Sequence, residues 1–184
     1  MNDKIKAEIN RNIIENSYYL IILFDEDKSK QANISITNLK LQKLMYFVEA
    51  YYMVKNPEEQ KLFDSQWSAW DYGPVNKDLY NHFKKFGSME IALLADEMSI
   101  GECLPEANKQ YIKKIYDLFG NFTAFDLVTL THMKGSPWDK IYKNNNISKK
   151  YKFDKLNDSV ISKEETKKWF EATFPFLFSD GKEA

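Results

Sequence analysis

The sequence has few cysteines and glycines and no excess of positive charge. It has a single cysteine, Cys103, among 184 residues, so no internal disulfide can form and a reducing, cytoplasmic compartment is expected. The six glycines stand singly, which excludes a glycine-rich phosphate-binding loop. The formal net charge of −1 does not favour non-specific binding to nucleic acid.

Long hydrophobic runs and metal-binding patterns are missing as well. The longest apolar run, YYLIILF, is far shorter than the ~20 residues that span a bilayer. The polar N-terminus has no signal-peptide pattern. Because His82, Cys103 and His132 are widely separated, we expect no metal and no cofactor. No nucleophile is paired locally with a base, so we expect a protein that is not an enzyme.

The charge that is present is unevenly distributed. The stretch 86–108 has five acidic residues and neither lysine nor arginine, whereas 134–155 has seven lysines against two aspartates. Charge runs of this kind are usually solvated surfaces. The alternative is a polarised surface that steers a partner.

Apolar residues recur at helical spacing along almost the whole chain. They predict a mainly α protein, a compact single-domain helical bundle of about six to seven helices. Thr37, Thr123 and Ser162 are expected to cap three of these helices. The predicted helical segments are 3 to about 25, 37–54, 74–87, 105–119, 123–134, 137–144 and 162–174, and the charged stretch from 25 to 33 is predicted to be a linker. The segment 88–104 is ambiguous between a short hairpin and a loop with one helical turn.

The most unusual segment is WSAWDYGPVNKDLYNHF, which begins at Trp67. Alternation of its side chains predicts a short extended or β segment near residues 65–72. Gly73-Pro74 is then expected to open a helix, with Pro74 at its first position. The helix at 37–54 is apolar on most of its circumference, which indicates a central position.

His132 lies in the last turn of the helix predicted at 123–134. There its ring could bond a free backbone carbonyl as a structural histidine. A role at a contact surface, or as the centre of an enzyme, is the alternative.

Three short motifs resemble those of the SocA-like antitoxin family, also called the Panacea domain. They are the Leu-Gln-Lys-Leu of 41–44, the Trp-Asp-Tyr-Gly-Pro-Val of 70–75, and Thr131-His132 followed by Pro137-Trp138. The resemblance covers about 13–143. It implies a mainly α-helical domain that neutralises a cognate toxin by direct binding, and one member is described as an adaptor to the ClpXP protease.

The resemblance also suggests how the chain is organised. We expect an N-terminal helix and linker at 1–33, the SocA-like core at 34–145, and a C-terminal extension at 146–184 with a helix packed on the same domain. The segments outside the core are expected to choose the partner. The sequence leaves open the oligomeric state and whether the protein is of host or phage origin.

Site residues follow from the same motifs. Those expected to bind the partner are Trp67, Trp70, Tyr72 and Trp138. Those expected to be structural are Gly73, Pro74, Val75, His132 and Pro137. For Trp70 and Trp138 a core position remains an alternative, because residues shared by members with different toxins suit a scaffold.

Two other functions remain open at this stage. Residues 34–54 could form part of a helix-turn-helix in a DNA-binding regulator, with the lysines of 134–155 in support. Against this, the helix is apolar and the chain slightly acidic, so nucleic acid is not the expected partner. The other alternative is a phage-associated protein that binds a host factor.

Overall fold

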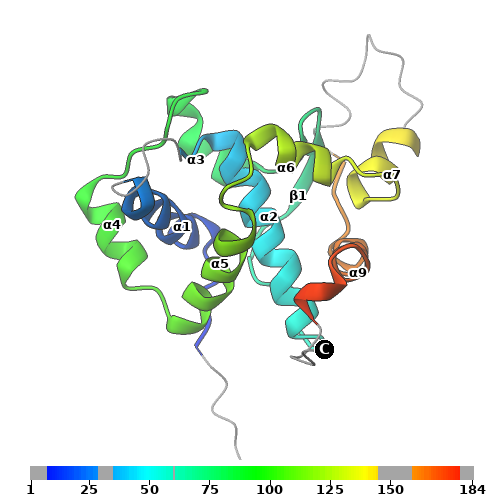
Figure 1. Cartoon of the computed structure of the whole chain (residues 1–184), viewed down its shortest axis with the longest axis horizontal. Coiled ribbons are helices and arrows are strands. Elements are labelled where there is room, and N and C mark those ends of the chain that lie inside the picture. Colours follow the sequence, from blue (N-terminus) through cyan, green and yellow to red (C-terminus); the bar gives the residue numbers. More distant parts are fainter. Residues whose placement is uncertain (1–7, 29–34, 60, 145–158, 179–184) are drawn as a thin grey trace, which may run out of the picture.

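Helices make up most of the chain in the computed structural model, which describes residues 8–28, 35–59, 61–144 and 159–178. Within these ranges the mainly α, single-domain fold is confirmed, with eight α-helices and one small antiparallel sheet (Figure 1). The helices are α1 (Ile13–Lys28), α2 (Asn38–Lys55), α3 (Lys77–Phe83), α4 (Ala95–Glu102), α5 (Glu106–Phe119), α6 (Ala124–Thr131), α7 (Pro137–Asn144) and α9 (Lys163–Thr173). Two 3-10 helices, η1 (Lys84–Phe86) and η2 (Pro175–Leu177), and the strands β1 (Trp67–Trp70) and β2 (Gly73–Asn76) complete the described elements.

Helix α2 is the centre of the fold. Figure 1 shows it running through the middle, with α1 and α4 on one side and α7 and α9 on the other. It packs against α5, α6, α9 and β2, and nearly all of its residues are buried. Thr37 caps it as predicted, because the Thr37 hydroxyl accepts a hydrogen bond from the Lys40 N–H at 3.4 Å.

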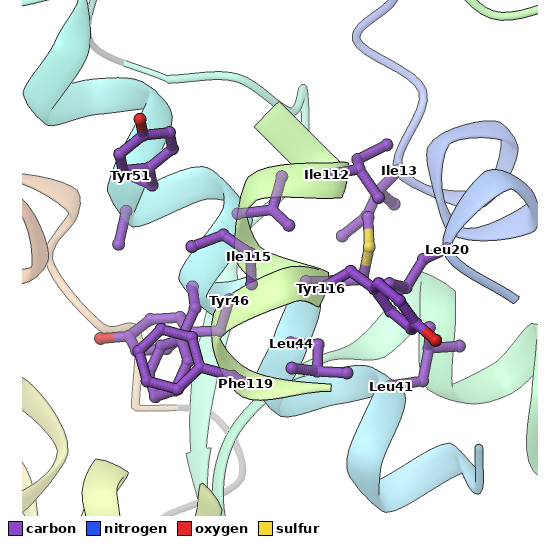
Figure 2. Packing of buried hydrophobic residues seen from close by; sticks show 14 of the residues in the cluster. Ile13, Leu20, Leu41, Leu44, Tyr46, Tyr51, Ile112, Ile115, Tyr116 and Phe119 are labelled. Atoms are coloured by element: carbon purple, nitrogen blue, oxygen red, sulfur yellow. The ribbon is translucent and has the colours of Figure 1, made fainter. Parts of the chain in front are cut away.

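The main core lies between α2, α5 and α1. Figure 2 shows Ile112 and Phe119 of α5 in one buried cluster with Leu41 and Leu44 of α2. Leu20 of α1 is buried in the same cluster. On α5 the buried side chains recur at helical spacing and form one face, and burying that face against α2 is what stabilises this packing.

The first helix begins later than predicted. Residues 8–12 are not helical, and α1 starts at Ile13. Asn12 explains the change, because its side-chain oxygen accepts from the Ile14 N–H at 3.0 Å and therefore caps the helix. The predicted linker begins too early, because 25–28 still belong to α1; the rest of it, 29–33, and the predicted cap, Asp3, lie outside the described residues.

The prediction that Gly73-Pro74 opens a helix is wrong. Both residues belong to β2, which pairs with β1 so that Ala69 is opposite Pro74. The Ala69 N–H points away from β2, to the carbonyl of Ser159 at 2.9 Å. This is therefore a non-hydrogen-bonded pair, in which the missing N–H of proline costs nothing. The helix starts at Lys77 instead, capped by the side-chain oxygen of Asn76.

Three smaller differences concern segment ends and exposure. The ambiguous segment 88–104 contains a helix, α4, which is one reason why there are more helices than expected. Helix α6 ends at Thr131, with His132 as its C-cap rather than within the last turn. Cys103 is exposed, whereas a lone cysteine is usually buried.

The segment before α9 is joined to the hairpin. The Ile161 N–H donates to the Trp67 carbonyl at 2.8 Å, so this segment runs beside β1. Ser162 caps α9, as predicted, by accepting from the Glu165 N–H at 3.3 Å. Across the described ranges, no helix combines the length and apolar character needed to cross a membrane.

Candidate functional site

The β-hairpin is fastened to α2 by two buried polar side chains. The Gln42 side-chain oxygen accepts from the Asn76 N–H at 2.8 Å, and the Lys43 ammonium donates to the Pro74 carbonyl at 2.8 Å. Burial lowers the pKa of Lys43 to about 7. In the motif Leu-Gln-Lys-Leu, the leucines therefore fill the core while the two polar residues hold the hairpin.

Gly73 sits where no other residue fits easily. Its φ angle is +98°, and an added Cβ would lie 2.6 Å from the Thr131 hydroxyl oxygen and 3.1 Å from Lys43 Cε. At Gly73 the hairpin therefore packs closely against Lys43 of α2 and Thr131 at the end of α6. Pro74 and Val75, which follow on β2, are buried.

Trp138 and His132 join the third motif to the hairpin. Their rings are parallel, with centroids 3.5 Å apart. The Trp138 indole N–H donates to the Trp70 carbonyl at 2.7 Å. The Trp138 side chain is almost fully buried, so the expectation that it belongs to an exposed aromatic surface is wrong and its alternative, a core position, is observed. Pro137, also buried, begins α7 just before it. The three motifs therefore meet in one cluster.

His132 is neutral at physiological pH in this setting. Burial and the nearby Lys43 lower its pKa to about 4, against a smaller opposing effect of Asp139. Its Nε2 is buried and has no hydrogen-bond partner within the described ranges. The ring stacks on Trp138, and this nitrogen does not make the bond to a backbone carbonyl that the sequence suggests for a ring N–H.

Trp67 is in the core, so the expectation that it contributes to an exposed aromatic surface is wrong. Its side chain is 2% exposed and its indole N–H donates to the buried carboxylate of Glu49. Glu49 also accepts from the Lys163 ammonium of α9 at 2.7 Å. Phe63, in the bend before β1, and Ala69, on β1, are buried as well.

A groove opens on the other side of the hairpin, between the start of α2 and α3. Its volume is about 370 Å³. The Trp70 ring lies in its wall, edge-to-face with Tyr80 at 4.8 Å. The residues that line it are Asn38, Leu39, Gln42, Trp70, Asp71, Tyr72, Val75, Tyr80, Lys84 and Gly87.

Tyr72 extends this groove onto the open surface. It is 60% exposed and meets Phe125 of α6, which is 66% exposed, at a ring distance of 6.4 Å. We call Tyr72 and Phe125 the aromatic pair. Tyr72 is among the residues predicted to bind the partner, whereas the sequence analysis does not single out Phe125. The exposure of Phe125 could have been predicted from the sequence, because Leu127, Val128 and Thr131 are enough to form the buried face of α6.

The described residues contain no candidate metal site. Their histidine, cysteine and acidic side chains do not gather in a group that could hold a metal ion. Lys43 is fully enclosed and His132 is stacked under Trp138, so neither lines the groove.

Comparison with known proteins gives a consistent picture. Residues 41–139 match the family described as "Antitoxin SocA-like, Panacea domain". Over 123 residues the chain is 30% identical to the protein named "Antitoxin SocA" from Caulobacter vibrioides (strain NA1000 / CB15N). That alignment covers 62% of this chain and 64% of the relative, so the chain spans less than two thirds of the relative's length. No solved structure matches the chain.

Proposed function

The chain belongs to the Antitoxin SocA-like, Panacea domain family, and from this premise we propose that it is the antitoxin of a bacterial or phage toxin–antitoxin pair. We propose that it neutralises the toxin by direct binding and carries out no catalysis itself. Its partner is then a toxin protein encoded beside it.

The observation that carries this proposal is the aromatic pair beside the groove. Two large rings with 60% and 66% exposure lie next to an apolar hollow, on the same side of the hairpin. Aromatic side chains supply much of the binding energy of protein interfaces. Such interfaces bury ~800 Å² on each partner, so the pair and the groove would form the centre of a larger contact.

The absence of catalysis is supported by the surroundings of the titratable groups. Lys43 donates to a backbone carbonyl inside the fold, and His132 is covered by an indole ring. A catalytic base has to reach its substrate within hydrogen-bond distance. Neither side chain lines the groove, where a substrate would bind.

Co-expression tests the function. The chain is expressed with each neighbouring open reading frame, and growth is scored with and without it. We expect one neighbour to be toxic alone, to be harmless together with this chain, and to co-purify with it. If no neighbour is toxic, the antitoxin proposal is wrong for this member.

The same assay tests the surface. Replacing Tyr72 and Phe125 together by alanine should abolish protection while leaving the melting temperature within a few degrees. Phe176→Ala is the matched control, because Phe176 is also 60% exposed but lies on η2, beyond α9. Protection that survives the double substitution would place the toxin contact elsewhere.

A further inference from the structure

We infer that the groove beside Trp70 receives an uncharged apolar side chain of the partner protein, and that the Trp70 indole N–H donates a hydrogen bond to the same partner segment. This inference rests on the proposed function, since it assumes that the partner is a protein. It adds to that function the kind of side chain that the partner inserts and the hydrogen bond that it accepts.

The lining of the groove selects an uncharged occupant. Leu39, Val75 and the rings of Trp70 and Tyr80 present mostly carbon. The charged lining residues, Asp71 and Lys84, have opposite signs and are both exposed. The groove therefore offers no net charge to hold a phosphate or a carboxylate. Its volume of about 370 Å³ has room for a large side chain.

The apolar residues in the groove are not needed by the core. Leu39, Trp70 and Tyr80 are partly buried, yet they belong neither to the main hydrophobic cluster nor to the side chains packed against it. The backbone around them is nevertheless fixed by hydrogen bonds to side chains of α2. Asn38 of α2 donates to the Tyr80 carbonyl at 3.3 Å, and Gln42 holds Asn76. The backbone around the groove is therefore preformed, and any adjustment to an occupant falls to the side chains.

The indole N–H of Trp70 is the feature that calls for an acceptor. It is buried, and no acceptor within the described ranges lies in hydrogen-bond reach. Buried donors without a partner are rare and destabilising, because they lose their water without replacement. An occupant that displaces the groove wall slightly and brings a backbone carbonyl would remove this penalty. Its binding would then depend on the N–H itself and not only on the ring.

The continuity of the surface favours a protein over a small molecule. Tyr72 lines the groove and also meets Phe125, so apolar surface continues beyond the hollow onto α6. A small molecule would fill the groove and leave the aromatic pair uncovered. A protein segment could insert one side chain and cover the pair at the same time.

Nuclear magnetic resonance on the full ¹⁵N-labelled chain tests the groove without any toxin. The four tryptophans give separate indole N–H signals, and Trp70→Phe assigns one of them. The probe is N-acetyl-L-phenylalaninamide, which carries an uncharged ring and amide carbonyls. We expect a saturable shift of the Trp70 signal at millimolar probe, while inorganic phosphate leaves it unchanged.

Leu39→Gln gives the specificity of this test. It should weaken the probe's effect about tenfold by making the groove wall polar, whereas Phe176→Ala should not alter it. A Trp70 signal that does not respond, or an equal response in the Leu39→Gln variant, would overturn the inference.

A second arm uses the toxin found by co-expression. Trp70→Phe keeps an aromatic ring and removes the N–H, so it should weaken toxin binding about tenfold with the melting temperature nearly unchanged. If Trp70→Phe and Leu39→Gln both bind the toxin at full strength, the groove inference fails while the antitoxin function stands. If no neighbour is toxic, the proposed function fails, and the probe titration still decides whether the groove binds an apolar side chain.

Discussion

At the scale of single residues, Gly73 is the position where the backbone and the packing act together. Its φ of +98° disfavours any side chain, and an added Cβ would lie 2.6 Å from the Thr131 hydroxyl oxygen. Gly73→Ala should therefore lower the free energy of unfolding by about 3 kcal/mol or more. Urea unfolding followed by circular dichroism measures this loss.

Gly135→Ala is the control that separates the two causes. Gly135 has a similar φ of +86°, but an added Cβ would meet nothing within 4 Å. The only cost there is that of holding a residue with a Cβ in the left-handed backbone conformation, about 1–2 kcal/mol. Equal losses for the two variants would show that the close approach to Thr131 contributes nothing.

His132 should make stability depend on pH. Burial and Lys43 lower its pKa to about 4, below the ordinary value of 6.5. The folded state therefore holds the neutral ring, and its stabilising contribution is complete above pH 6.5 and is lost as the pH falls toward 4. His132→Gln removes this dependence. The difference in the free energy of unfolding between the two proteins should therefore shrink by about 1 kcal/mol as the pH falls over that range.

The measurement is urea unfolding of both proteins at pH 7, 5.5 and 4.5. Taking the difference between them cancels the titration of the carboxylates that they share. Parallel profiles would mean that the ring takes up a proton as readily in the folded protein as in the unfolded chain, in conflict with its burial and the nearby Lys43.

At the scale of secondary-structure elements, α9 is a part of the core although it lies outside the matched residues 41–139. Phe170 of α9 is fully buried, with its ring 5.6 Å from Phe47 of α2. Phe170→Ala should lower the free energy of unfolding by about 3–5 kcal/mol. Phe176→Ala, at an exposed position on η2, should change it by less than about 0.5 kcal/mol.

Thermal unfolding of the two variants provides the comparison. A small effect of Phe170→Ala would mean that α9 is a detachable arm, as expected of a segment that varies to choose a partner. A large effect would indicate instead that α9 completes the domain.

The elements themselves were largely predictable from local chemistry. Thr37, Thr123 and Ser162 cap three helices, because a hydroxyl just before an apolar periodic run satisfies the free N–H groups there. The prediction failed at Gly73-Pro74. A proline after glycine suits a helix start and also a non-hydrogen-bonded strand position, and only the pairing with Ala69 distinguishes the two.

The candidate site was predictable only in part. Lys43 and Glu49 interrupt a helix that is otherwise apolar on most sides, which was a readable sign of buried polar contacts. Trp67 and Trp70 are three residues apart in one strand, and alternation places them on opposite faces. The sequence could not decide which face lies inside, since that depends on the contact with Glu49 and α9.

At the scale of the whole molecule, the position of α2 bears on the alternative of a DNA-binding regulator. A recognition helix has to expose one face to the major groove. Nearly every residue of α2 is buried, and α5, α6, α9 and β2 pack around it. The helix that suggested a helix-turn-helix is therefore the scaffold on which the other elements assemble.

The remaining support for DNA binding is the lysine-rich stretch 134–155, of which 145–155 lies outside the described residues. With a net charge of −1, we expect no binding of the upstream promoter tighter than about 10⁻⁶ M in 50 mM salt. Fluorescence anisotropy of labelled promoter DNA measures this, with the seven lysines replaced by glutamine as the control. Tight binding that falls about a thousandfold by 200 mM salt, and that the control loses, would instead make the lysines a phosphate-contacting surface. That outcome would add regulation of its own promoter to the proposed toxin binding, because Lys134 and Lys140, which belong to the described part of the stretch, neither line the groove nor form the aromatic pair.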